Sequence, residues 1–212
     1  MRAFKSFVRH LRAGQRILDV GCGDRPFLRF LEHVEYIGID FRPQDPSIIA
    51  HDLTTPLPFG DSEFDGIILS EVLEHIPNPF DLLSQVKRVA KPGAVVFLST
   101  PFALPVHGSP FDFYRYTNFF YDRIFELFSW EKLEFSSSNS VLSTPFQISN
   151  QIVLGVPAPY FVKRMYWVLS NLLSLIFEQA VRLARKKTRE KLFHAMPIGY
   201  NAIYRVLEAH SV

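Results

Sequence analysis

The sequence predicts an α/β fold, in which helices cover both faces of a doubly wound, mostly parallel sheet of seven strands. Short apolar runs alternate with helical patterns along the first hundred residues, which is typical of parallel sheets. The first run, 17–20, ends at a glycine-rich turn, and the second, 36–39, ends at Asp40. Because parallel sheets hold ligands beyond the carboxyl ends of their strands, we expect a ligand site there.

Every strand of this sheet is expected from a short apolar run. The parallel strands are expected at residues 16–19, 36–40, 48–50, 66–69 and 94–99, and the last of them follows the turn Lys91-Pro92-Gly93. Two closing strands are expected at residues 130–136 and 198–206.

Helical patterns lie between the strands. Residues 26–33 and 78–89 are expected to be helical, the second with Asn78 as its N-cap and Pro79 in its first turn. Apolar residues at helical spacing also predict a short amphipathic helix at the start of the chain, formed around Phe4, Phe7, Val8 and Leu11.

The turn after the first strand distinguishes two classes of cofactor. A dinucleotide site uses Gly-x-Gly-x-x-Gly to place a pyrophosphate at a helix N-terminus. Here Gly21 and Gly23 are present, but Pro26 stands at the third position and Asp19 precedes the first glycine. A carboxylate at this place repels a pyrophosphate but suits a ligand with an ammonium group and a sulfonium. The turn therefore disfavours a nicotinamide oxidoreductase, and Asp40 is placed to accept both hydroxyls of a ribose.

Residues 17–23 resemble the first motif of class I S-adenosylmethionine-dependent methyltransferases, and further matches follow in that family's order up to residue 100. They are His51-Asp52-Leu53 and the stretches 57–65, 66–76 and 91–99. The resemblance implies a Rossmann-like fold with an antiparallel last strand, S-adenosylmethionine as the cofactor and S-adenosylhomocysteine as its product. It also implies the cofactor-binding residues, which are Asp19, Gly21, Cys22, Gly23, Asp40, Phe41, Asp52, Leu53, Ser70 and Glu71.

The resemblance also assigns parts of the cofactor to residues of this set. It assigns the ribose to Asp40, the adenine amino group to Asp52 and the adenine ring to the backbone amide of Leu53. Ser70 and Glu71 would flank the bound cofactor. The chain departs from many relatives at Arg25, where they carry a third glycine. Arg25 is expected to be a solvated side chain, or to reach an anionic substrate.

Composition limits the class of protein. A chain of 212 residues fits one domain, with a cofactor-binding half at 1–100 and an acceptor-side loop, a long helix and closing strands at 101–212. A net charge of +2 is too small to indicate nucleic acid as a partner. The single cysteine, Cys22, excludes an internal disulfide, and the seven histidines show no metal-ligand spacing, so no metal is expected. Charges interrupt the first apolar residues, so we expect no secretory signal and a cytoplasmic protein.

The segment 100–117 leaves the fifth strand over the expected cofactor site, where an acceptor would enter. His107 is a candidate general base, and His75, just after the fourth strand, is the other. The alternative for His107 is a loop residue that hydrogen-bonds to the backbone and holds the loop in place. The alternative for His75 is a residue that bonds a nearby carbonyl. In this segment Arg115 would bind a phosphate or carboxylate of the acceptor, or else pair with Asp112. Two aromatic residues would face a sugar ring or simply pack, namely Tyr114 and Tyr116.

The pattern of residues 105–117, Pro-x-His-x-x-Pro-x-Asp-Phe-Tyr-Arg-Tyr-Thr, resembles a bacterial methyltransferase subgroup linked to the assembly of cell-surface polysaccharides and glycolipids. The resemblance implies a small-molecule, saccharide or lipid-linked acceptor, with oxygen as the expected nucleophile. The alternative is a non-catalytic module of the same fold that docks a protein or a membrane.

One long amphipathic helix is expected from Tyr160 to Arg185, followed by a basic cluster that extends to Lys191. A helix of this kind can cover its own domain, form a homodimer contact, or lie on an anionic membrane surface. The third possibility would make the protein membrane-associated, which would suit a lipid-linked acceptor.

Overall fold

The computed structural model describes residues 1–138, 142–184, 186, 188 and 197–207. The chain packs as two compact units. The first comprises Met1–Thr100, Pro110–Ser136 and Asn201–Val212, and the second comprises Pro101–Ser109 and Ser137–Tyr200. Several basic residues of the expected cluster lie outside the described residues, namely Arg185, Lys187, Arg189 and Lys191.

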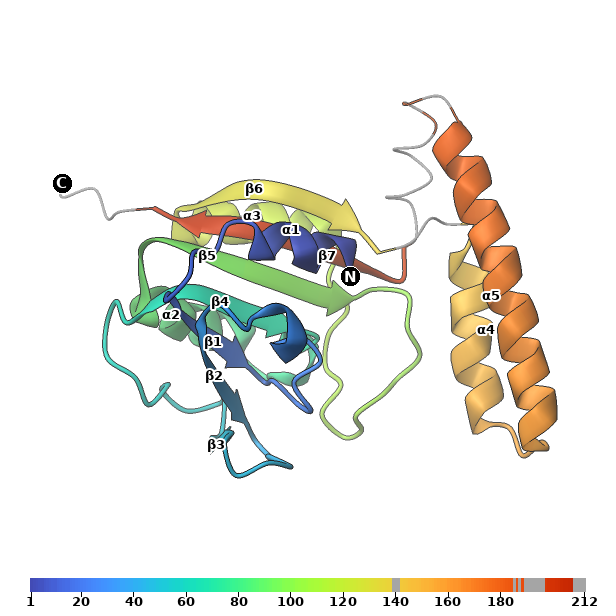
Figure 1. Ribbon diagram of the computed structural model, residues 1–212, viewed down its shortest axis with the longest axis horizontal. Coiled ribbons are helices and arrows are strands. Elements are labelled where there is room, and N and C mark those ends of the chain that lie inside the picture. The colour runs from blue at the N-terminus through green and yellow to red at the C-terminus, as the bar shows by residue number, and fades with distance from the viewer. Residues whose placement is uncertain (139–141, 185, 187, 189–196, 208–212) are drawn as a thin grey trace. The chain divides into compact units, whose positions relative to one another are not determined.

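The sheet has seven strands, as the sequence predicts, and the structure places them in the order β3-β2-β1-β4-β5-β7-β6. Parallel ladders join β1 to β2, β1 to β4, β2 to β3 and β4 to β5. Figure 1 shows β7 running in the opposite direction to β5, so the expected antiparallel last strand is present. The strands are β1 (Arg16–Val20), β2 (Glu35–Asp40), β3 (Ile49–Ala50), β4 (Phe64–Ser70), β5 (Ala90–Pro101), β6 (Trp130–Ser137) and β7 (Gly199–Val206).

The Lys91-Pro92-Gly93 turn lies inside β5 rather than before it. Gly93 has a φ of +81°, a conformation that favours glycine. The ladder between β4 and β5 shifts its register at this place, between Phe64 and Gly66. The strand therefore starts earlier than predicted, because Ala90 already pairs with Phe64 before the turn.

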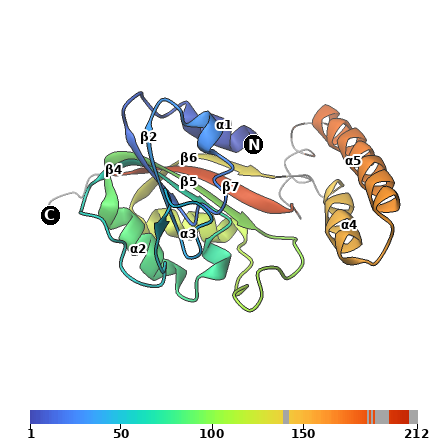
Figure 2. The ribbon, with the colours of Figure 1, turned by 60° about the horizontal axis from the view of Figure 1, so that its bottom comes forward.

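Helices cover both faces of the sheet in the first unit. Figure 2 shows α1 (Arg2–Val8) on one side of the sheet and α2 (Pro79–Val89) and α3 (Asn118–Phe128) on the other. On the α1 side, Phe4 and Phe7 are fully buried and their rings pack on Phe97 of β5. Each aromatic ring buried in this way contributes roughly 1.5–3 kcal/mol. The predicted N-terminal helix and the predicted helix at 78–89 are both confirmed.

The predicted helix at 26–33 is wrong, because only a short 3₁₀ turn, η1 (Leu28–Phe30), forms there. Its backbone bonds span three residues, as in the bond from the Leu28 amide to the Arg25 carbonyl, and Arg25 itself has a φ of +56°. The ring of Phe27 stacks on Phe4 of α1 at a centroid distance of 4.0 Å. This packing with α1 holds the segment in an irregular path that the local pattern does not reveal.

The second unit contains a helical hairpin. It consists of α4 (Thr144–Gly155) and α5 (Tyr160–Leu183), which run side by side (Figures 1 and 2). The long helix is thus confirmed up to Leu183, whereas α4 was not expected from the sequence. No described helix has both the length and the hydropathy needed to cross a membrane.

Candidate functional site

The glycine turn after β1 is built from two glycines with different constraints. Gly21 has a φ of +69°, and a Cβ added there would lie 2.6 Å from the Cγ2 atom of Val72. Gly23 also has a positive φ, of +51°, but a Cβ there would meet no atom within 4 Å. The backbone therefore needs Gly21 for packing, while Gly23 leaves open space beside the turn, into which a ligand can approach closely.

The turn is tied to the end of β2 by hydrogen bonds. The amides of Gly21 and Cys22 donate to the carbonyl of Ile39 at 2.9 and 3.1 Å. The amide of Gly23 donates to Oδ2 of Asp40 at 2.9 Å, while the Arg42 amide donates to Oδ1 of the same carboxylate. Asp40 thus lies beside the glycine turn, as expected of a residue that accepts ribose hydroxyls.

Asp19 is a buried carboxyl group below this turn. Its residue is only 2% exposed, and the hydroxyl of Tyr36 donates to its Oδ2 at 2.7 Å. Burial raises the pKa of Asp19 to about 7, although the hydrogen bond from Tyr36 lowers it. A buried carboxylate gains most from a cationic ligand, so this donor set fits the ammonium and sulfonium of S-adenosylmethionine. The sequence did not identify Tyr36, although strand alternation places it on the same face of the sheet as Asp19.

Cys22 is a small buried residue of the turn rather than a reactive thiol. Burial raises the pKa of its thiol to about 12, and the charge of Asp19 adds to this rise. A Cβ at Gly38, in the neighbouring strand, would lie 2.8 Å from the Cys22 sulfur. The glycine of β2 thus makes room for the cysteine side chain.

Three more predicted cofactor residues lie around the ends of β2 and β3. Asp52 is exposed, and its Oδ1 accepts hydrogen bonds from the amide and hydroxyl of Thr54, which hold the pKa of the carboxyl below its usual value. Leu53 is buried, and one of its methyl groups would lie 3.6 Å from a Cβ at Gly21. Phe41, directly after Asp40, is exposed.

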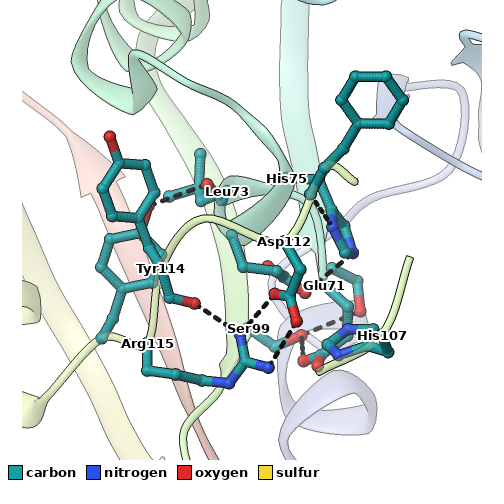
Figure 3. A network of polar contacts seen from close by, with 12 residues as sticks. Glu71, Leu73, His75, Ser99, His107, Asp112, Tyr114 and Arg115 are labelled. Carbon is teal, nitrogen blue, oxygen red and sulfur yellow. Dashed lines mark hydrogen bonds and ion pairs between the residues drawn. The ribbon is translucent and has the colours of Figure 1, made fainter. Parts of the chain in front are cut away.

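Ser70 and Glu71 meet a third residue at the carboxyl ends of β4 and β5. The Ser70 and Ser99 hydroxyl oxygens lie 2.9 Å apart, and the Ser99 hydroxyl donates to Oε1 of Glu71 at 2.9 Å (Figure 3). Glu71 has a φ of +55°, which is uncommon for a residue with a side chain. Its amide donates to the Ser99 carbonyl, so the sheet fixes this turn. The sequence alone did not identify Ser99 as a member of this group. Its place there follows from the structure, in which Ser99 pairs with Ser70 in the β4–β5 ladder.

His75 ends the short 3₁₀ turn η2 (Leu73–His75). Its Nδ1 lies 2.7 Å from the carbonyl oxygen of Phe111, and because a carbonyl only accepts, Nδ1 carries the proton (Figure 3). Its Nε2 lies 3.6 Å from Oε1 of Glu74, which is fully buried. Burial raises the pKa of Glu74 to about 8, and the charge of Glu71 contributes to the rise. His75 therefore bonds a nearby carbonyl, as one of the two alternatives states, and Glu74 is a titratable neighbour that the sequence did not identify.

The segment after Pro110 is fastened to η2 and the residues that follow it. The Phe113 amide donates to the Glu74 carbonyl at 2.8 Å, and the Tyr114 hydroxyl donates to the Pro77 carbonyl at 2.7 Å. The Tyr116 hydroxyl donates to the Leu73 carbonyl at 2.9 Å. Tyr114 is 38% exposed, whereas Tyr116 is 6% exposed and its ring stacks on Phe120. Of the two candidate tyrosines, Tyr116 packs and Tyr114 reaches the surface.

Arg115 and Asp112 form a two-pronged ion pair. The two guanidinium nitrogens lie 2.5 and 2.8 Å from the two carboxylate oxygens, and the side chain of Asp112 is almost completely buried (Figure 3). This is the pairing that the sequence left open as an alternative to binding of an acceptor. The pair lies in the first unit with His75 and Glu71.

His107 belongs to the second unit, in the segment Pro101–Ser109. It is half-buried, and its Nδ1 lies 3.2 Å from the carbonyl oxygen of Pro105. That carbonyl can only accept, so Nδ1 of His107 donates this hydrogen bond. Its proposed role as a base stays a prediction.

Comparison with known proteins identifies the family. A family described as a methyltransferase domain matches residues 1–134. A ubiquinone biosynthesis O-methyltransferase of Dechloromonas aromatica is 32% identical over an alignment of 111 residues, with 42% of this chain and 45% of that protein covered. The chain spans less than half the length of the curated relatives it matches.

Solved structures share the fold at low sequence identity. An S-adenosylmethionine-dependent methyltransferase of Archaeoglobus fulgidus has a TM-score of 0.60 and 16% identity, with 96% of this chain and 91% of that chain covered. The [4+2]-cyclase SpnF has a TM-score of 0.61 and 17% identity, with 97% and 80% covered. At these identities the likeness shows the fold alone.

Proposed function

The chain belongs to the methyltransferase domain family, and we propose that it transfers a methyl group from S-adenosylmethionine to a hydroxyl oxygen of a saccharide or lipid-linked acceptor. The observation that supports this most is the buried carboxyl of Asp19, held by Tyr36 below an open glycine turn. A site of this kind favours a cation beside a nucleoside, and Asp40 lies next to the turn to bind the ribose.

When bound, S-adenosylmethionine supplies a methyl group on a positively charged sulfur. Residues that follow successive strands of the sheet would bind successive parts of this cofactor. Asp19 and the turn at Gly21–Gly23 would bind its amino acid part, Asp52 and Leu53 its adenine, and Ser70 and Glu71 would flank it. Because methyl transfer depends mainly on alignment, a rigid set of strand ends serves the reaction better than mobile groups would.

The acceptor would be bound by the segment that is fastened over η2. Tyr114 is exposed and can face a sugar ring, while the Asp112–Arg115 pair would hold the segment in place beside it. Tyr116 would support this surface from below through its bond to the Leu73 carbonyl. The expected link to cell-surface polysaccharide or glycolipid assembly rests on the pattern of residues 105–117.

A hydroxyl acceptor must lose its proton as the new bond forms. We expect a histidine Nε2 to take it, and His107 and His75 are the two candidates. In both, Nδ1 contacts a carbonyl, so Nε2 would be the atom that takes the proton, and that of His75 lies 3.6 Å from Oε1 of Glu74. General-base assistance of this kind contributes roughly 10²–10⁴-fold to a rate.

A non-catalytic module that docks a protein or a membrane is the second candidate function. It is favoured by the long helix α5, whose apolar side chains are largely exposed.

The decisive first experiment is calorimetric titration of the full chain with S-adenosylmethionine and S-adenosylhomocysteine, with NADH as the control. We expect dissociation constants of the order of micromolar for both sulfur compounds and no binding of NADH. A folded protein that binds neither compound would contradict the proposed activity and favour the docking module.

The acceptor is then identified by transfer of an isotopically labelled methyl group. Lipid-linked saccharides, free polysaccharides and protein are offered in parallel, and the labelled product is hydrolysed to locate the methyl group. Label on a sugar oxygen is the expected result. Label on nitrogen or carbon, or on protein alone, would overturn the proposed acceptor but leave the methyltransferase activity standing.

A further inference from the structure

The helical hairpin of the second unit has polar side chains between its own two helices. On α5, Ser170 and Ser174 are buried, although both are polar. The Ser170 hydroxyl donates to the backbone carbonyl of Phe146 in α4 at 3.1 Å. The side-chain amide nitrogen of Gln147 donates to the Ser174 hydroxyl at 3.2 Å. The Ser143 hydroxyl, just before α4, donates to Glu178. Apolar contacts are also present there, since the rings of Phe146 and Phe177 stack and Val181 is buried.

The opposite face of α5 is apolar and exposed along most of its length. Its large apolar side chains recur at intervals of three and four residues, so they share one stripe of the helix. All are more than half exposed, and they are Phe161, Met165, Val168, Leu169, Leu172, Leu175, Ile176 and Leu183. In a helix hairpin surrounded by water the apolar stripe turns inward, and here the polar stripe does so instead.

This inverted arrangement has a physical meaning. A hydrocarbon environment cannot satisfy polar side chains, so a protein in contact with it must pair them internally and expose its apolar ones. The hairpin pairs Ser143, Ser170, Ser174 and Gln147 between its helices, although buried Asn150 of α4 has no such partner, and the apolar stripe on the outer face of α5 carries no group that needs a hydrogen bond. An extended exposed apolar face of this kind marks a surface that binds another apolar surface.

Charge indicates which apolar surface this is. Residues 144–183 contain Lys163, Arg164 and Arg182 but only one acidic residue, Glu178, which pairs with Ser143. The basic residues stand near the two ends of α5, and the sequence adds five more between residues 185 and 191. Basic groups at the ends of an apolar stripe match a layer of anionic headgroups above acyl chains. Tyr160 and Trp167 add exposed aromatic rings, which favour the interface between water and lipid.

We propose that the outer face of the α4–α5 hairpin docks on an anionic lipid bilayer, with α5 lying in the plane of the headgroups and its apolar stripe in the acyl boundary. This inference concerns the hairpin alone and does not depend on the proposed acceptor. The consequence for the enzyme is that its second unit would be held at the membrane surface.

The test is flotation of the full chain with vesicles of phosphatidylcholine alone and of phosphatidylcholine with about one third phosphatidylglycerol. We expect the chain to float with the anionic vesicles, and at least tenfold less with the neutral ones or in high salt. The fluorescence of Trp167 should shift to shorter wavelengths on binding, because the other tryptophan, Trp130, is already buried and stays constant.

A matched pair of variants separates the proposed face from general hydrophobicity. Phe161 on the hairpin and Phe119 on α3 are exposed to the same degree, at 71% and 73%. We expect Phe161→Glu to reduce vesicle binding at least tenfold, with Phe119→Glu close to wild type, and Phe161→Glu combined with Leu172→Glu to reduce binding further. Cofactor titration of each variant shows that the first unit is intact, so a failure of docking is distinguishable from a failure of the proposed function.

Three results would overturn the proposal. Equal binding to neutral and anionic vesicles would exclude an anionic bilayer as the specific partner, and equal binding by both variants would exclude the hairpin stripe as the docking face. A concentration-dependent dimer that the Leu172→Glu change dissociates, with no vesicle binding, would assign the face to a second copy of the chain. A monomer that binds no vesicles and loses thermal stability on the same change would show that the chain covers the face itself.

Discussion

The Tyr36 hydroxyl donates a 2.7 Å hydrogen bond to Oδ2 of Asp19, and these two residues come from adjacent parallel strands below the glycine turn. The bond fixes one oxygen of a carboxyl group that is otherwise out of contact with water. Asp19 is thus held in place before any ligand arrives, at the cost of a burial that disfavours its charge.

Stability should depend on pH through Asp19. Burial raises the folded pKa to about 7, above the unfolded value, so this group stabilises the fold fully below about pH 4 and loses that contribution as pH rises toward 7. Asp19→Asn keeps the neutral form, and it should raise the free energy of unfolding by roughly 2–4 kcal/mol at pH 8 but by little at pH 4. Urea denaturation of the ligand-free protein at both values measures this. An equal change at both would exclude the titration of Asp19 as the cause.

Cofactor affinity should depend on Asp40. We expect Asp40→Ala to weaken binding of S-adenosylmethionine at least about 100-fold, because the ribose loses a charged hydrogen-bond acceptor, while the loss of its bonds to the Gly23 and Arg42 amides costs only about 1–2 kcal/mol of stability. Calorimetric titration and thermal unfolding give the two numbers. Asp61→Ala, which removes an exposed carboxylate paired with Arg88, is the control with normal affinity. Unchanged affinity in Asp40→Ala would move the ribose elsewhere.

Substitution of the two glycines of the turn should have different effects, on stability at Gly21 and on cofactor affinity at Gly23. Gly21→Ala places a Cβ 2.6 Å from Val72 in a left-handed conformation and should cost roughly 2–4 kcal/mol of stability. Gly23→Ala meets no neighbour, so we expect a loss of only about 1 kcal/mol but a weakened cofactor complex, since the added methyl group occupies the open space. Denaturation and titration of both variants test the contrast. If Gly23→Ala bound the cofactor normally, the space beside it would not be part of the site.

Substitution of Tyr116 and Tyr114 in the acceptor segment should also have different effects. Tyr116→Phe removes a buried hydrogen bond to the Leu73 carbonyl, which should cost about 1–2 kcal/mol. Tyr114→Phe removes a more exposed one and should change stability by less than about 0.5 kcal/mol, but it should raise KM if Tyr114 faces the acceptor. Denaturation curves and kinetics distinguish the two outcomes. A KM change in Tyr116→Phe alone would reverse the assignment.

Turnover should depend on a histidine. His107→Ala should lower kcat by roughly 10²–10⁴-fold with the affinity for S-adenosylmethionine within about twofold of wild type. His33→Ala, an exposed histidine, is the control. Normal turnover in His107→Ala would remove it as the base, and the same assay on His75→Ala would then decide whether the other candidate acts instead.

The sequence was sufficient to place the strands and the cofactor end of the site, because buried apolar runs and the acids that follow them are local patterns. It was not sufficient where partners come from elsewhere in the chain. Tyr36 and Ser99 are assigned only by the register of neighbouring strands, and the irregular path around Phe27 results from stacking on Phe4 of another element. The amphipathic pattern of α5 was visible, but only α4 shows which face is turned inward.

The chain segment between β6 and β7, which includes the hairpin, begins and ends at two residues that lie close together. The backbone amide of Ser138, the residue directly after β6, donates to the carbonyl of Gly199, the first residue of β7, at 2.9 Å. These two strands are neighbours in the sheet, so a tight turn can join them directly. The junction is therefore a natural splice point, at which a protein engineer can excise the intervening residues or graft a different module without breaking the sheet.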